Sequence, residues 1–185
     1  MKALLFAILI SGSVSAVSTG TAVATKQERW QKLMHLVNQE MKILENAKRK
    51  GVEIKYRMLE LHSEKVKLIH EKNNQEFMKA SAVSKTGKDK EKYFSETRAY
   101  YQTTKDFGLK ILREEVKNSR KAEIMYAMAL NSRDYGRDNI TEKYLLEVIS
   151  MVKDSKNSLR HHAQTALADF YYNEKRFPDA ITYVS

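Results

Sequence analysis

Apolar residues recur at alternating steps of four and three along much of this chain, and that spacing constrains its fold more than any other feature. In the segment 26–49 the residues at these steps are Trp30, Met34, Val37, Met41 and Leu44. In the segment 93–116 they are Tyr93, Thr97, Tyr100, Thr104, Phe107 and Ile111, with Phe94 and Tyr101 alongside. An α-helix has 3.6 residues per turn, so each set lies on one helical face. Only one proline and six glycines occur among 185 residues, and the sequence therefore predicts an all-α protein.

A second long helix is expected over residues 52–79, after Gly51 ends the first. One stripe of apolar residues is widened by a second, and the two together comprise Ile54, Met58, Leu61 and Leu68 with Leu59, Val66 and Ile69. A stripe of that width predicts one packing partner on each flank. Residues 81–92 then break the periodicity with Ser, Thr, Gly and four lysines, which predicts a loop.

The segment 161–183 predicts a helical hairpin. Its first helix carries one stripe of large and small residues, Leu167, Ala168 and Tyr171. The polar residues 173–176 interrupt the apolar pattern, and the only proline, Pro178, follows them. Because the first turn of a helix accepts proline, a second helix should begin near Phe177. Ala180 is then placed to pack beneath the tyrosine of the first helix.

An earlier copy of this pattern is expected from residue 119. Its predicted turn, NSRDYG at residues 131–136, resembles NEKRFP at 173–178 in the order asparagine, charged residues, aromatic residue and helix breaker. The two asparagines are 42 positions apart (131 to 173), which indicates an internal repeat. Two dipeptides match Leu167-Ala168, and the sequence leaves both registers open: Tyr126-Ala127 and Met128-Ala129.

The order Leu-small-x-x-Tyr, an aromatic residue in the turn and alanine in the next helix resembles the tetratricopeptide repeat (TPR), a unit of about 34 residues. The resemblance covers residues 161–183, where Gln164 replaces the family's tryptophan, and the earlier copy has about eight extra residues, which we place around 137–141. It implies antiparallel helical hairpins stacked as a TPR-like α-solenoid. Residues 26–116 would be long, degenerate TPR-like helices, and 119–185 TPR-like repeats of which the last is incomplete. An ordinary antiparallel helical hairpin with an alanine crossing is the alternative.

The same resemblance implies where a partner would bind. In the family, the first helix of each unit lines a concave groove that holds a segment of another protein. The positions of this chain that match the groove are His162, Thr165, Asp169, Tyr172 and Asn173. Adjacent tyrosines such as Tyr171 and Tyr172 fit this arrangement, because one packs inward while the other borders the surface.

The first 16 residues have the order of a secretory signal peptide: Lys2, an apolar run from Ala3 to Ile10, and small residues ending at Ala16. The apolar run is too short to span a bilayer. We expect cleavage after residue 16, with an alternative after residue 24, and therefore an exported chain without a stable membrane anchor. An uncleaved anchor or a buried first helix is the other interpretation.

The sequence offers little catalytic chemistry. It holds no cysteine, which excludes disulfides, cysteine nucleophiles and lipoprotein-type lipid attachment. No histidine pair has the i, i+4 spacing of a helical zinc site, and we interpret all five as helix-surface residues: His35, His62, His70, His161 and His162. No Gly-rich phosphate loop or Gly-x-Ser-x-Gly elbow occurs. We therefore expect no enzyme activity, no metal and no cofactor.

The net charge of +10 would attract polyanions, but acids alternate with the bases, as on a solvated helix surface. We expect no nucleic-acid partner, and we read residues 85–92, KTGKDKEK, as a solvated loop. A contact of that loop with an anionic membrane or a cell-wall polymer is the alternative.

Together these features predict an exported TPR-type scaffold, in the periplasm of a Gram-negative bacterium, that binds a partner protein in an envelope assembly. The chain resembles the N-terminal part of longer exported repeat proteins and stops at Ser185, inside its last helix, so we expect a fragment or an incomplete array. That last helix also offers a surface for self-association. The alternatives are a self-associating helical-bundle or coiled-coil structural protein and a basic module that binds nucleic acid or cell-wall polymer.

Overall fold

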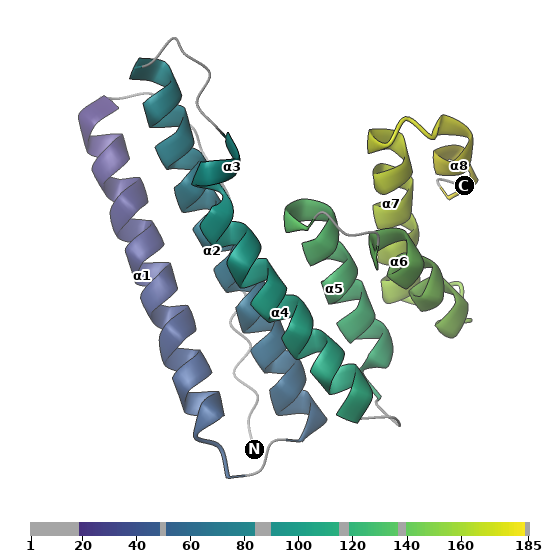
Figure 1. Cartoon of the computed structure of the whole chain (residues 1–185). Coiled ribbons are helices and arrows are strands. Elements are labelled where there is room, and N and C mark those ends of the chain that lie inside the picture. The colour runs from purple at the N-terminus through teal and green to yellow at the C-terminus, as the bar shows by residue number, and fades with distance from the viewer. Residues whose placement is uncertain (1–18, 49–50, 84–89, 115–118, 137–139, 184–185) are drawn as a thin grey trace.

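The computed structural model describes residues 19–48, 51–83, 90–114, 119–136 and 140–183, and all regular secondary structure in these ranges is α-helical. The helices are α1 (Thr19–Glu45), α2 (Val52–Val83), α3 (Lys90–Tyr93), α4 (Ser95–Glu114), α5 (Lys121–Tyr135), α6 (Ile140–Met151), α7 (Ser158–Asn173) and α8 (Phe177–Thr182). Helices α1, α2, α4 and α5 lie side by side, and α6, α7 and α8 extend the stack beyond α5 (Figure 1). The predicted all-α class is confirmed.

Helix α1 packs on α2 through the predicted apolar stripe. Val37 and Met41 of α1 are buried against Met58, Leu61 and Leu68 of α2, and half-buried residues flank them: Trp30, Met34 and Leu44. The indole Nε1 of Trp30 donates a hydrogen bond of 2.7 Å to the carbonyl oxygen of Leu68. The predicted stripe of residues 26–49 therefore lies on one buried face.

The other flank of α2 packs on α4 and α5, as the width of its stripe predicted. Leu59 of α2, Ile111 of α4 and Ile124 of α5 belong to one buried cluster that continues through α6, α7 and α8. Further along α2, the buried side-chain amide of Asn73 donates a hydrogen bond of 2.9 Å to the hydroxyl of Thr97 on α4. One apolar core thus joins the regions before and after residue 116.

Several helix boundaries differ from the sequence prediction. Helix α1 begins at Thr19 rather than residue 26, so the alternative cleavage position after residue 24 falls within it; the predicted signal peptide, residues 1–16, lies outside the described residues. Helix α2 runs to Val83, and α3 already includes Lys90–Tyr93, so both ends of the predicted 81–92 loop are helical. Lysine and glutamate are strong helix formers, which accounts for the helical segment Lys90–Tyr93 at the end of the predicted loop.

The predicted turn at residues 131–136 is wrong, because α5 continues to Tyr135. Asn131 lies inside the helix and is 6% exposed. Its amide nitrogen donates to the hydroxyl of Ser63 on α2 and to the carbonyl of Ala127, both at 2.8 Å. These bonds satisfy a side chain that otherwise favours turns and ends of helices.

The α7–α8 hairpin follows the prediction closely. Helix α7 ends at Asn173, and α8 begins at Phe177 with Pro178 in its first turn. Between them Lys175 has a φ of 60°, and the amides of Arg176 and Lys175 bond to the carbonyls of Tyr171 and Tyr172 at 2.8 and 3.0 Å. This pair of bonds is the Schellman motif that commonly ends helices.

The two C-terminal hairpins share one spacing of buried residues. Leu167, Ala168, Tyr171 and Ala180 each lie 39 positions after a buried residue of the preceding hairpin (128 to 167, 141 to 180), namely Met128, Ala129, Ser132 and Thr141. Of the two dipeptides that match Leu167-Ala168, Met128-Ala129 is buried, whereas Tyr126-Ala127 is half-buried. The predicted repeat of 42 residues assumed that Asn131 and Asn173 hold the same place in two hairpins. They do not, because Asn131 lies inside α5 whereas Asn173 is the last residue of α7.

Candidate protein-binding surface

The five predicted groove residues all lie on α7, and all are exposed: His162, Thr165, Asp169, Tyr172 and Asn173. Steps of three and four place the first four on one helical face, opposite the buried Ala163, Leu167 and Tyr171. Tyr172 is 65% exposed, whereas its neighbour Tyr171 is 4% exposed. The structure thus brings the predicted residues together, and the tyrosine pair divides between core and surface as predicted.

Helix α5 lies against α7 and contributes charge to this surface. The Arg133 guanidinium forms an ion pair of 2.8 Å with Asp134. That ion pair raises the pKa of Arg133 despite its partial burial, and Asp169 across on α7 adds to the increase. Sequence reasoning missed Arg133 because it assigned this residue to a turn, and only the helical register of α5 reveals it.

A polar cluster fixes the end of α7 against α6 and α8. The Tyr171 hydroxyl donates to Glu142 at 2.8 Å, and Arg176 contacts the same carboxylate at 3.1 Å and Asp179 at 2.7 Å. Burial and the bond to Glu142 raise the pKa of Tyr171 to about 12. The Arg176 guanidinium lies 4.3 Å from the Tyr171 ring centroid, within range of a cation–π interaction. These contacts hold the hairpin turn, and therefore the last turn of the surface, in one geometry.

An apolar edge borders the surface at the same end. Phe177 and Ile181 of α8 are 49% and 71% exposed, and the Tyr172 ring meets Phe177 edge-on with centroids 5.5 Å apart. We call Arg133 with the five α7 residues the α5–α7 surface. It combines an exposed aromatic ring, an amide and opposite charges, so it offers both apolar contact area and hydrogen-bonding groups.

The interpretation of all histidines as surface residues is wrong for two of them. His62 Nδ1 lies 2.9 Å from the Tyr100 hydroxyl, and the ring packs 5.0 Å from Phe107. The His70 ring packs 4.9 Å from that of Phe94. The His62 ring lies where α2 faces α4, whereas the His70 ring packs against Phe94, between α3 and α4, and at 5.2 Å against Tyr135 of α5. Burial lowers the pKa of both histidines.

Within the described ranges, no three His, Asp or Glu side chains are grouped as a metal ion would require. No helix in those same ranges combines the length and apolar character needed to cross a bilayer.

Comparisons of the chain with models of protein families, with characterised proteins and with solved structures found no match. The resemblance of residues 161–183 to a TPR unit therefore rests on the residues and their arrangement alone.

Proposed function

We propose that this protein is an exported scaffold of TPR type that binds a segment of a partner protein on the α5–α7 surface. The observation that carries the proposal is the packing order of the helices. Helix α5 contacts both members of the pair before it, α2 and α4, and α7 contacts both α5 and α6. Repeats that stack as a solenoid make contacts of this kind with their neighbours.

The buried residues support the same arrangement. The two C-terminal hairpins bury small or polar residues at matching positions: Ala129 and Ala168, and Thr141 and Ala180. The spacing of 39 residues between matching positions of the two hairpins exceeds the TPR unit of about 34 residues. The connection between α6 and α7, residues 152–157, has room for the excess, so the extra residues are assigned there rather than to 137–141.

The α5–α7 surface suits an extended segment that carries a basic residue and a bulky apolar residue. Asp169 would pair with the basic group, while Tyr172 and Phe177 would cover the apolar side chain. Arg133 would bind a backbone carbonyl or a carboxylate of the segment, since its guanidinium presents several donors. Export, and a place in an envelope assembly, belong to the same proposal and rest on the sequence of residues 1–16.

A photo-crosslinking amino acid at Thr165 tests this proposal in the native cells. Thr165 is exposed on α7, and Ser150, exposed on α6, provides a matched control position. We expect a discrete protein adduct from position 165, absent at 150 and lost when Tyr172→Ala is added. Equal adducts from both positions, or none from 165, would refute the proposed surface.

Self-association is a second candidate function, favoured by a different helix. Leu36 and Ile43 of α1 are 50% and 70% exposed and lie seven positions apart, so they share one side of that helix. Such a pair suits a coiled-coil contact with a second copy. Light scattering after gel filtration separates the candidates: a dimer that Ile43→Asp dissociates supports self-association, whereas a monomer at all concentrations excludes it.

A further inference from the structure

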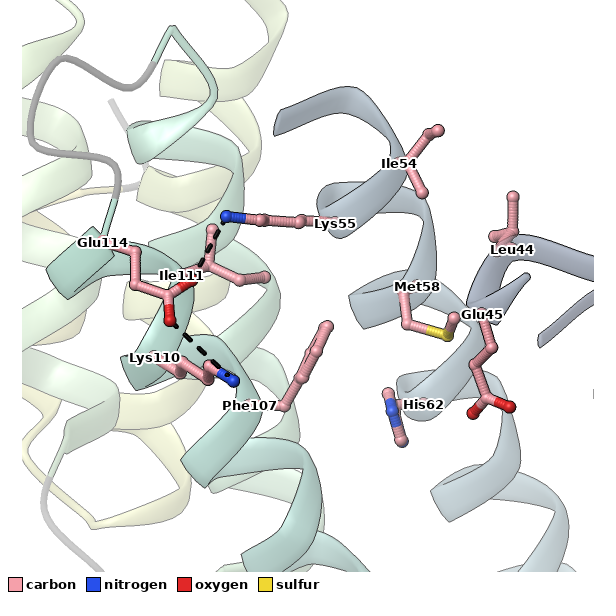
Figure 2. Close-up of a pocket in the computed structure, with 10 residues that line it drawn as sticks. All are labelled: Leu44, Glu45, Ile54, Lys55, Met58, His62, Phe107, Lys110, Ile111 and Glu114. Carbon is pink, nitrogen blue, oxygen red and sulfur yellow. Dashed lines mark hydrogen bonds and ion pairs between the residues drawn. The ribbon is translucent and has the colours of Figure 1, made fainter. Parts of the chain in front are cut away.

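A cavity of about 300 Å³ opens between α1, α2 and α4, away from the α5–α7 surface (Figure 2). Its apolar lining comes from all three helices and comprises Leu44, Ile54, Met58, Phe107 and Ile111. Met58 and Ile111 are 7% and 1% exposed, so the deep part of the cavity is apolar and fixed by the core. The volume is at the lower end of the range of about 300–1,000 Å³ for small-molecule sites.

His62 and Phe107 form one wall of the cavity, as Figure 2 shows. The Nδ1 atom of His62 is bonded to the Tyr100 hydroxyl. Burial lowers the pKa of His62 and nearby Lys65 lowers it further, while the Glu45 carboxylate opposes them, so the net shift favours the neutral ring. This wall therefore presents two uncharged aromatic faces, which suit an aromatic or aliphatic body.

The charges at the mouth are unevenly paired. On the α4 side, Glu114 lies 3.2 Å from the Lys55 ammonium and 3.8 Å from the Lys110 ammonium, and Figure 2 shows both contacts. On the α1 side, Glu45 is exposed at the end of its helix, and among the described residues its carboxylate has no ion-pair partner. The mouth thus places an exposed carboxylate opposite two lysines that already contact another carboxylate.

We propose that this cavity binds a small organic cation, an amine carried on an aromatic or short aliphatic body, with the body between Phe107 and Met58 and the ammonium at Glu45. A carboxylate ligand would meet Glu45 and Glu114 at the mouth, where the lysines are already engaged. The site is independent of the α5–α7 surface and shares none of its residues.

Titration of the purified chain with phenethylamine, followed by NMR of the backbone amides, tests the site directly. We expect saturable shifts at residues lining the cavity, with phenethyl alcohol about 1.4- to fivefold weaker because an exposed ion pair contributes about 0.2–1 kcal/mol. Phenylacetate should be weaker still. Absence of saturable shifts at these residues with phenethylamine, or equal binding of phenylacetate, overturns the proposal.

Two variants distinguish the contribution of the Glu45 charge to binding from that of the apolar cavity. Glu45→Gln should reduce the affinity for phenethylamine to that for the alcohol, whereas Glu28→Gln, an exposed carboxylate on the same helix, should leave it unchanged. Ile54→Trp should fill the cavity and abolish binding of both probes. Since Glu45 is exposed, its variant keeps the test intact even where Ile54→Trp does not fold. Undiminished binding by Glu45→Gln would overturn the assignment of the ammonium site.

Discussion

Replacing Gly108 with leucine tests how α4 packs on α5, the contact that joins the N-terminal helices to the C-terminal hairpins. A Cβ atom at Gly108 would lie 2.5 Å from Sδ of Met128 and 2.9 Å from its Cγ. Carbon atoms in van der Waals contact are about 3.5–4.0 Å apart, so Met128 must move. It is 2% exposed and has no solvent to move into. Leucine therefore fits only if the Met128 side chain repacks within the core or α4 moves away from α5.

The expected loss follows from two opposing effects. Overpacking a core costs about 1–3 kcal/mol, and the distances at Gly108 place this site in the upper part of that range. Leucine has a higher helix propensity than glycine by about 0.8–1 kcal/mol, which offsets part of the cost. We expect a net loss of about 1–2 kcal/mol in the free energy of unfolding. For a chain of this size that lowers the melting temperature by about 2–8 °C.

Urea denaturation followed by circular dichroism measures the loss. Gly51→Leu is the matched control, because a Cβ at Gly51 meets nothing within 4 Å; since Gly51 precedes the first residue of α2, the loss of a favourable N-cap residue should cost no more than roughly 0.5–1 kcal/mol. Met128→Ala alone should cost about 2–5 kcal/mol, and less when leucine occupies position 108. A Gly108→Leu protein as stable as the parent would refute the predicted contact. So would a double variant whose loss of stability equals the sum of the losses of Gly108→Leu and Met128→Ala within about 0.5 kcal/mol.

Three further predictions concern other parts of the fold. Lys175→Gly should stabilise the protein by about 0.4–1 kcal/mol in the same assay because Lys175 has a φ of 60°, whereas Glu174→Gly, at a φ of −78°, should not. Asn131→Ala should destabilise it by about 1–3 kcal/mol by leaving the buried end of α5 without its bond to Ser63; a change below about 0.5 kcal/mol would contradict that role. Burial lowers the pKa of His62, so below about pH 6.5 the unfolded chain binds more protons than the folded one, and the melting temperature should fall as the pH drops. The fall should be less steep in His62→Gln. Equal dependence of the melting temperature on pH in the two proteins would contradict this.

The predictions that succeeded rest on periodicity. The four–three stripes of residues 26–49 and 93–116 identified helical faces that are buried in the structure. The wide stripe of α2 correctly required a partner on each side. Pro178 placed the start of α8, because proline fixes the backbone of a first helical turn. In each case the signal lies within one helix and needs no knowledge of distant residues.

The predictions that failed depended on contacts across the fold. Asn131 and its polar neighbours have turn composition, yet the hydroxyl of Ser63, far away in sequence, satisfies the asparagine inside α5. His62 was taken for a surface residue because nothing in the sequence places Tyr100 and Phe107 beside it. Tertiary contacts of this kind override local preference.

The candidate sites divide in the same way. The exposed face of α7 followed from helical spacing and the family resemblance, whereas Arg133 depended on the register of α5. The cavity between α1, α2 and α4 combines residues from 44 to 114, and no motif in the sequence connects them.

The affinity of the crosslinked partner segment for the purified chain tests the proposed scaffold most directly. Isothermal titration calorimetry would compare the parent with Tyr172→Ala and with Ile43→Ala, since Tyr172 and Ile43 are 65% and 70% exposed but lie on different helices. Removing a central aromatic contact typically costs about 2 kcal/mol or more, so we predict a loss of affinity of about 30-fold for Tyr172→Ala and little change for Ile43→Ala. Equal affinities of the parent and Tyr172→Ala would contradict binding on the α5–α7 surface.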